Sequence, residues 1–214
     1  MSLKKLVESH QKFKEKYHKK YYDMFRELVE KGQSPKSLFI GCSDSRVVPN
    51  LITSTDPGEL FVIRNVGNFV PPFRPDSDYH GTAAAIEYAV SVLKVENVIV
   101  CGHTHCGACE HLYHAIPDDP ELIHVKKWLE IAEPVKAHVL QLHAEDDEIR
   151  YRMTEKFNII EQLFNLFSYP AIQRRALEGN LTLQGWYYHI QSGEIEYFNP
   201  ETNAFESVTD TLQP

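Results

Sequence analysis

Three short apolar runs, at residues 36–41, 60–64 and 97–101, constrain the fold of this chain more than any other feature. Runs of this length are typical of strands that a parallel sheet buries on both faces. A segment with helical periodicity, residues 81–93, precedes the third run. This alternation predicts right-handed parallel connections. The expected fold class is therefore α/β, with a mostly parallel central sheet flanked by helices.

The N-terminal segment has a different pattern. Between Leu3 and Lys31 apolar side chains recur three and four residues apart, and Gly32 ends the pattern. This periodicity predicts a long amphipathic N-terminal helix. It carries more aromatic surface than one face of a small domain needs, so we expect residues 1–32 to form a helical arm that packs on a partner subunit.

The C-terminal part of the chain predicts a hairpin. Residues 181–190 and 194–198 have the composition of two strands, with Ser192 and Gly193 as the turn. The second strand would be a C-terminal antiparallel edge strand of the sheet. The chain has no internal repeat and no low-complexity tract, and its length favours one domain over two. Residues 1–214 are therefore expected to form a single domain.

The composition narrows the classes of function. The chain has 30 acidic and 22 basic residues and a formal charge of -8, which argues against nucleic-acid or anionic-membrane partners. No apolar run reaches about 18 residues, and the N-terminus lacks the apolar core of a secretory signal, so a cytoplasmic address is expected. With only four cysteines, metal ligation explains the thiols better than a disulfide framework.

The strongest functional signal follows the third apolar run. Residues 101–109 carry three thiols and two imidazoles, and glycines interrupt them at positions 102 and 107. Thiolate and imidazole together suit zinc best among the common divalent ions. Side chains two residues apart on an extended backbone share a face, and a third at the next helix N-terminus can converge on the same point. His103 and Cys106 are therefore expected to bind zinc.

A second group of candidate residues, Cys42, Asp44 and Arg46, follows the first apolar run. In an open parallel sheet, ligands bind beyond the carboxyl ends of the strands, where the winding direction reverses. If the first and third strands are neighbours there, Cys42 joins His103 and Cys106 around one zinc ion per chain. Catalytic zinc keeps its fourth position for water.

Asp44 could itself fill that fourth position and close the site. Arg46, however, offers a planar fork that grips a carboxylate in two places. An Asp44 held in this way can accept a hydrogen bond from zinc-bound water and orient the hydroxide toward a substrate. The sequence thus favours a catalytic zinc site with an Asp44–Arg46 dyad.

Less specific explanations exist for some of these residues. Cys106 and Cys109 alone would also fit a redox pair or half of a structural zinc site. A zinc-dependent base deaminase needs a His-x-Glu and Pro-Cys-x-x-Cys pairing that the chain lacks. Cys101 and Cys109 are expected to be small buried residues, and His105 is expected to point away from the zinc ligands.

Four blocks of sequence, in this order and spacing, resemble a known family. The blocks are Cys42-Ser43-Asp44-Ser45-Arg46, Arg64-Asn65-Val66-Gly67-Asn68, Gly81-Thr82 with Glu87-Tyr88-Ala89, and Gly102-His103-Thr104-His105-Cys106-Gly107. They look like those of the β-class carbonic anhydrases, closely over residues 33–109 and more loosely over 181–197. The resemblance implies the same three zinc ligands and the same dyad. It also implies reversible hydration of carbon dioxide to bicarbonate and a proton, in a homodimer or homotetramer.

The resemblance further predicts a substrate pocket, partly built by a neighbouring subunit. Its residues would be Gln33, Phe61, Val66 and Tyr88. Two residues indicate the plant-type subgroup, in which the metal site stays open. One is Gln33. The other is Phe39, because family members whose Asp binds the metal and closes the site typically carry Trp at this position. Two other functions stay open: a carbonyl sulfide or carbon disulfide hydrolase on the same scaffold, and a non-catalytic zinc scaffold protein.

Overall fold

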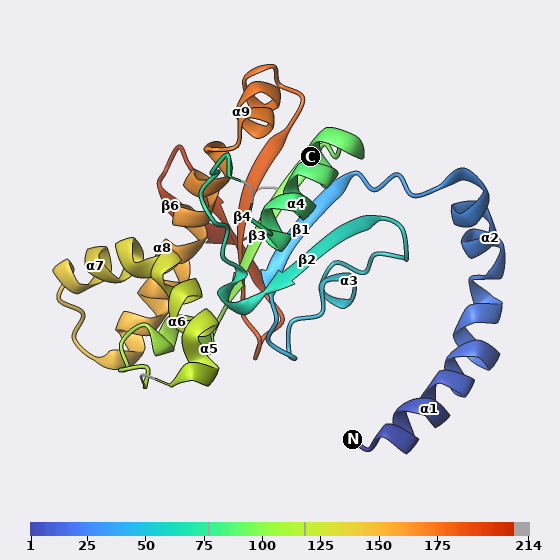
Figure 1. Cartoon of the computed structure of the whole chain (residues 1–214), viewed down its shortest axis with the longest axis horizontal. Coiled ribbons are helices and arrows are strands. Elements are labelled where there is room, and N and C mark those ends of the chain that lie inside the picture. Colours follow the sequence, from blue (N-terminus) through green and yellow to red (C-terminus); the bar gives the residue numbers. More distant parts are fainter. Residues whose placement is uncertain (77, 118, 208–214) are drawn as a thin grey trace.

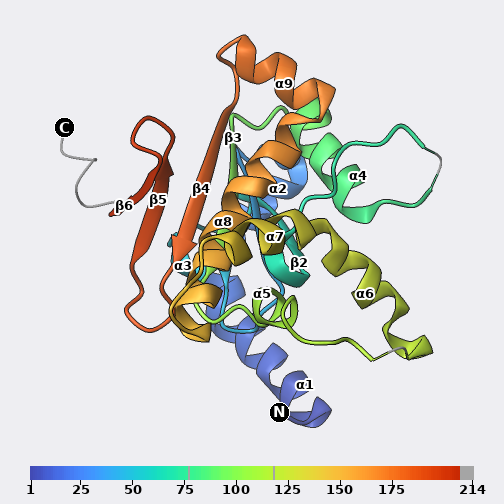
Figure 2. The same ribbon diagram turned by 90° about the vertical axis from the view of Figure 1, so that its left-hand side faces the viewer.

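A six-stranded sheet forms the centre of the molecule in the computed structural model, which describes residues 1–76, 78–117 and 119–207 (Figures 1 and 2). The strands are β1 Ser37–Cys42, β2 Leu60–Asn65, β3 Asn97–His103, β4 Thr182–Tyr188, β5 Ile195–Asn199 and β6 Ala204–Ser207. Their order is β2-β1-β3-β4-β5-β6. The first four in this order are parallel, and β5 and β6 are antiparallel to their neighbours. The predicted α/β fold with a mostly parallel sheet is confirmed.

Helices connect the strands and cover mainly one face of the sheet. They are α1 Leu3–Lys12, α2 Tyr22–Lys31, α3 Pro49–Ile52, α4 Gly81–Glu87, α5 Gly107–His111, α6 Ile123–Leu129, α7 Glu133–Gln141, α8 Asp147–Phe167 and α9 Pro170–Leu177. Two π-helical segments, Phe13–His18 and Tyr88–Val92, continue α1 and α4. In the described part of the chain, no helix is both long and apolar enough to span a bilayer.

The two faces of the sheet differ in how well they are covered. Because side chains alternate along a strand, Leu38 and Ile40 of β1 point into one large core, together with residues of α4, α8 and α9. The opposite face buries only a small cluster of Phe39, Ile99 and Cys101. The described residues of the same chain thus leave this second face largely without cover.

Glycines in the strands allow α8 to pack directly on β3 and β4. A Cβ atom at Gly102 would lie 2.8 Å from Ile159 Cδ1, and one at Gly185 would lie 2.7 Å from Ile159 Cγ2. Ile159 is fully buried, so it has little room to move. The close approach brings the N-terminal half of α8 beside the end of β3.

Gly102→Ala is expected to destabilise the protein by about 1–3 kcal/mol, because the added methyl overpacks the contact with Ile159. Urea unfolding monitored by circular dichroism measures this change. Gly81→Ala is the matched control, because a Cβ atom at Gly81 meets no atom within 4 Å. Equal unfolding free energies for Gly102→Ala and the unchanged protein would show that α8 does not approach β3 this closely.

The N-terminal arm, residues 1–32, reaches away from the sheet (Figure 1). Neither α1, the π segment nor α2 contains a buried residue. The predicted long helix is present but not regular, because the π segment leads to a break at Tyr21 before α2. Leu28 packs against the turn at Gly58, where an added Cβ atom would lie 2.7 Å from Leu28 Cδ2.

The C-terminal end of the sheet extends beyond the prediction. β5 is antiparallel to β4 as expected, but it also pairs with β6, which occupies the edge. Strand β6 was not predicted, since its four residues are too few for a clear alternation of apolar and polar side chains.

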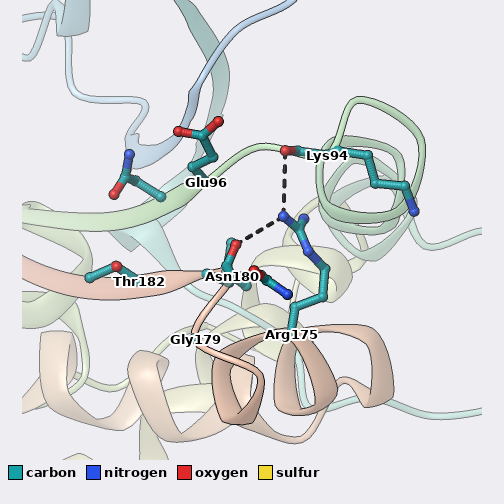
Figure 3. A pocket seen from close by; sticks show the side chains of 8 residues that line it. Lys94, Glu96, Arg175, Gly179, Asn180 and Thr182 are labelled. Carbon is teal, nitrogen blue, oxygen red and sulfur yellow. Dashed lines mark hydrogen bonds between the residues drawn. The ribbon is translucent and has the colours of Figure 1, made fainter.

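The amino ends of β3 and β4 border a polar cavity of about 580 Å³ (Figure 3). Arg175, from α9, is buried there and donates hydrogen bonds to the carbonyl oxygens of Val90, Lys94 and Asn180. The Arg175 side chain therefore joins the end of the helical segment after α4 to the turn between α9 and β4. The candidate catalytic residues lie at the other edge, where the parallel strands end.

Candidate metal centre and active site

Three potential metal ligands meet at the carboxyl ends of β1 and β3. The Sγ atoms of Cys42 and Cys106 and a ring nitrogen of His103 lie within 4.8 Å of one another, and all three residues are buried. Cys42 ends β1, His103 ends β3, and Cys106 is the N-cap of α5. The pairing of Gly41 with Cys101 places the two strand ends side by side. The predicted convergence of the two motifs is present.

The His103 ring is oriented as a metal ligand would be. Its Nδ1 atom donates to the carbonyl oxygen of Thr104 at 2.9 Å, which leaves Nε2 directed at the thiols. This Nε2 is buried and has no hydrogen-bond partner of ordinary geometry among the described residues, although the Cys42 thiol lies against it. An orphaned imidazole nitrogen between two thiols fits a tetrahedral zinc ion.

The thiols need a cation to ionise. Contact with the Cys106 thiol, together with burial, raises the pKa of Cys42 to about 12. A hydrogen bond with Cys109, together with burial, raises the pKa of Cys106 well above its usual value. Because a metal binds the thiolate form, zinc would displace protons from both residues.

Asp44 is held by Arg46 in two places. Arg46 Nε donates to Asp44 Oδ1 at 2.9 Å, and Nη2 donates to Oδ2 at 2.6 Å. The backbone N–H of Arg46 also donates to Oδ1, at 2.9 Å. These hydrogen bonds from Arg46 lower the pKa of Asp44 far below its usual range, so the carboxylate stays ionised.

Arg64 and Trp128 support the loops of the site. Arg64 Nε donates to the carbonyl oxygen of Cys42 at 3.0 Å and Nη2 to that of Asp44 at 2.7 Å. Trp128 Nε1 donates to the carbonyl oxygen of Val66 at 2.7 Å. The guanidinium of Arg64 therefore fixes the backbone between the first potential metal ligand and the carboxylate.

The predicted pocket residues fall into two groups. Val66 directly follows β2, whose last residue, Asn65, pairs with Cys42. Gln33, in contrast, precedes β1, whose ends are roughly 16 Å apart at the usual rise per residue. Phe61 and Tyr88, with ring centroids 6.0 Å apart, also lie toward that far end, since Phe61 pairs with Leu38. Within one chain, only Val66 is beside the three potential ligands.

One buried acidic residue at the site was not predicted. Glu155 of α8 is 1% exposed, and its Oε1 atom accepts a hydrogen bond from the backbone N–H of Cys106 at 2.8 Å. It lies 49 residues after Cys106, in a helix with many other charged residues. Nothing in the spacing could single it out. As predicted, Cys101 and Cys109 are buried and His105 is exposed.

Comparison with known proteins agrees with this geometry. Residues 37–195 match the family described as carbonic anhydrase. The chain is 41% identical to a carbonic anhydrase of Helicobacter pylori strain J99 over 199 residues, which cover 90% of each chain. It is also 41% identical over 218 residues to one of Synechocystis, covering 99% of this chain and 78% of the relative.

Solved structures show the same likeness. The β-carbonic anhydrase CcaA superposes with a TM-score of 0.89 at 42% identity, covering 96% of this chain and 91% of that one. A β-carbonic anhydrase of Sordaria macrospora, described as tetrameric, has a TM-score of 0.80 at 28% identity, with 91% and 95% covered.

Fold and site together define an α/β enzyme with a buried Cys-His-Cys metal site at the carboxyl edge of a parallel sheet. The family match and the relatives specify it further: the chain belongs to the β-class carbonic anhydrases. The predicted class of enzyme, a carbonate dehydratase, is confirmed.

Proposed function

We propose that this protein catalyses the reversible hydration of carbon dioxide to bicarbonate and a proton, with one zinc ion held by Cys42, His103 and Cys106. The observation that carries the proposal is the buried sulfur-nitrogen-sulfur triad next to a carboxylate that Arg46 holds. Zinc bound there would act as a Lewis acid and make water a nucleophile near neutral pH.

Asp44 orients the attacking water in this proposal. Its Oδ1 atom accepts two hydrogen bonds from Arg46, whereas Oδ2 accepts one and keeps a lone pair for a further donor. Arg46 prevents the carboxylate from turning toward the metal ligands, because turning would break both guanidinium hydrogen bonds. This arrangement supports the assignment to the plant-type, open-site subgroup, as does Phe39.

Stopped-flow measurement of carbon dioxide hydration, with zinc content determined on the same sample, tests the proposed function. We expect one zinc per chain and hydration well above the uncatalysed rate. Carbonyl sulfide and carbon disulfide serve as alternative substrates in the same assay. Turnover of either of these without carbon dioxide hydration would contradict the proposal, and so would bound zinc without any turnover.

We also propose that the active form contains at least two copies of this chain. The arm exposes eight large apolar side chains: Met1, Leu3, Leu6, Val7, Phe13, Tyr17, Tyr22 and Val29. Residues 1–31 contain nine basic and five acidic residues and are therefore positively charged, whereas the whole chain has a charge of -8. The arm is thus opposite in charge to the rest of a second copy. The sheet face around Phe39 offers it an apolar surface. The second copy would also contribute Gln33, Phe61 and Tyr88 to the pocket.

Deletion of residues 1–32 is expected to yield a monomer with strongly reduced hydration activity, because the deletion removes the apolar surface that joins two copies. Light scattering after size exclusion measures the mass, which for the unchanged protein should be a multiple of 24.7 kDa. Leu177→Ser, which removes an exposed apolar side chain outside the arm, is the control and should keep the mass of the unchanged protein. A full-length protein that is active as a monomer would rule out this assembly.

The cytoplasmic address stays a prediction.

A further inference from the structure

The buried carboxylate of Glu155 makes three hydrogen bonds around the metal centre. Oε1 accepts from the backbone N–H of Cys106 at 2.8 Å and from Arg152 Nη2 at 2.6 Å, and Oε2 accepts from the Tyr187 hydroxyl at 2.6 Å. At 1% exposure, this ionisable side chain is buried at a desolvation cost that only good partners offset. The hydrogen-bond partners of this carboxylate therefore indicate which part of the site it holds in place.

The peptide group between His105 and Cys106 is held from both sides. Its N–H donates to Glu155, and its carbonyl oxygen accepts from Arg46 Nη2 at 2.9 Å. Arg46 is also the residue that grips Asp44. This peptide group therefore connects Cys106 with two residues: with Arg46 of the dyad through the carbonyl oxygen, and with Glu155 through the N–H.

This peptide would not hold its orientation by backbone preference alone. His105 has a φ of 57°, in the left-handed region that non-glycine residues rarely adopt. Arg152 contacts the His105 ring, with Nη1 3.0 Å from Nδ1, and at the same time contacts Glu155. Arg152 and Glu155 thus stabilise a strained turn that carries one metal ligand and adjoins another.

Glu155 can reach this turn because α8 packs directly on the glycines of β3 and β4. Gly102 immediately precedes His103, and its lack of a side chain lets Ile159, one helical turn after Glu155, touch the strand. Tyr187 comes from β4, where it pairs with Gly102. The hydrogen-bond partners of Glu155 therefore come from α8, β4 and the N-cap of α5.

We propose that Glu155 is a positioning residue of the metal centre: it fixes the His105–Cys106 peptide so that Cys106 binds the metal and Arg46 holds Asp44. This inference rests on the proposed zinc site. Partners that orient a metal ligand in this way typically change metal affinity or activity 10–100-fold when removed. If Glu155 acts through its hydrogen bond to Cys106, a side chain of the same shape that still accepts this bond should keep part of the metal affinity.

The test compares zinc release from the intact protein and from Glu155→Ala, Glu155→Gln and Gln162→Ala, using a chromogenic chelator in excess. Gln162 is the matched control, because it is also buried in α8 and accepts a backbone hydrogen bond, from Val70 at 2.7 Å, away from the metal ligands. The cobalt-substituted forms give a second measurement, since their visible absorption bands report ligand geometry. Melting temperatures show how far each variant is destabilised.

We expect Glu155→Ala to release zinc about 10–100-fold faster and to shift the cobalt bands. Glu155→Gln should show a smaller increase, because its amide oxygen can still accept from Cys106 but without charge assistance. Gln162→Ala should be destabilised with the release rate unchanged. If Glu155→Ala does not fold, Glu155→Gln decides the question.

Release at the unchanged rate from the Glu155 variants would overturn this inference alone, as would an equal acceleration in Gln162→Ala. Failure of the unchanged protein to bind one zinc per chain would instead overturn the proposed metal centre itself. The two failures are therefore distinguishable.

Discussion

Cys42→Ala protein is expected to contain almost no zinc and to hydrate carbon dioxide near the uncatalysed rate. In the proposed site Cys42 would supply one of two thiolates among three protein ligands, so its removal would leave only His103 and Cys106 to hold the ion. Zinc content by mass spectrometry and hydration by stopped flow measure both effects. Because zinc displaces the proton of a thiol whose pKa is raised to about 12, the affinity of the unchanged site should also fall as pH falls.

Cys101→Ala is the control for this experiment. Cys101 is equally buried and lies two residues before His103, but it is not one of the three convergent side chains. We expect it to keep its zinc and its activity. Normal zinc content in Cys42→Ala would refute the proposed ligand set.

Asp44→Asn is expected to lower kcat by about 10²–10⁴-fold while zinc stays bound, because the amide has only one acceptor oxygen. With that oxygen on Arg46, its NH2 group can only donate and cannot accept the hydrogen bond that orients the nucleophile. Asparagine keeps the shape of the side chain, but Arg46 then loses the carboxylate that it holds through Nε and Nη2. Hydration rates at saturating carbon dioxide and zinc content, measured on the same preparation, separate catalysis from metal binding.

Asp146→Asn provides the comparison. Asp146 is exposed and likewise accepts a backbone hydrogen bond, from Ile149 at 2.8 Å, but at the N-terminus of α8. This substitution should leave the rate unchanged. If Asp44→Asn were fully active, the dyad would have no catalytic role; if it lost zinc, Asp44 would be a ligand.

The sequence predicted those parts of the site that local motifs and parallel strands determine. Cys42, Asp44 and Arg46 lie within five residues, so their mutual geometry follows from one turn. The contact of Cys42 with His103 and Cys106 needed only the adjacency of two parallel strands, which buried apolar runs indicate.

Contacts that depend on helix packing were not predictable in the same way. Glu155 meets Cys106 only because α8 crosses the sheet over Gly102, a close approach that helical periodicity does not encode. The positions of Gln33 and Phe61 show a second limit. A motif can associate a residue with a pocket without saying which copy of the chain supplies it.

A zinc-edge anomalous map of the crystallised protein tests the central claim most directly. We predict one peak per chain, about 2.3 Å from the Sγ atoms of Cys42 and Cys106 and about 2.0–2.1 Å from His103 Nε2. The Asp44 carboxylate should remain on Arg46 and not coordinate the metal. No peak among these three residues, or a peak ligated by Asp44 in place of solvent, would contradict the account.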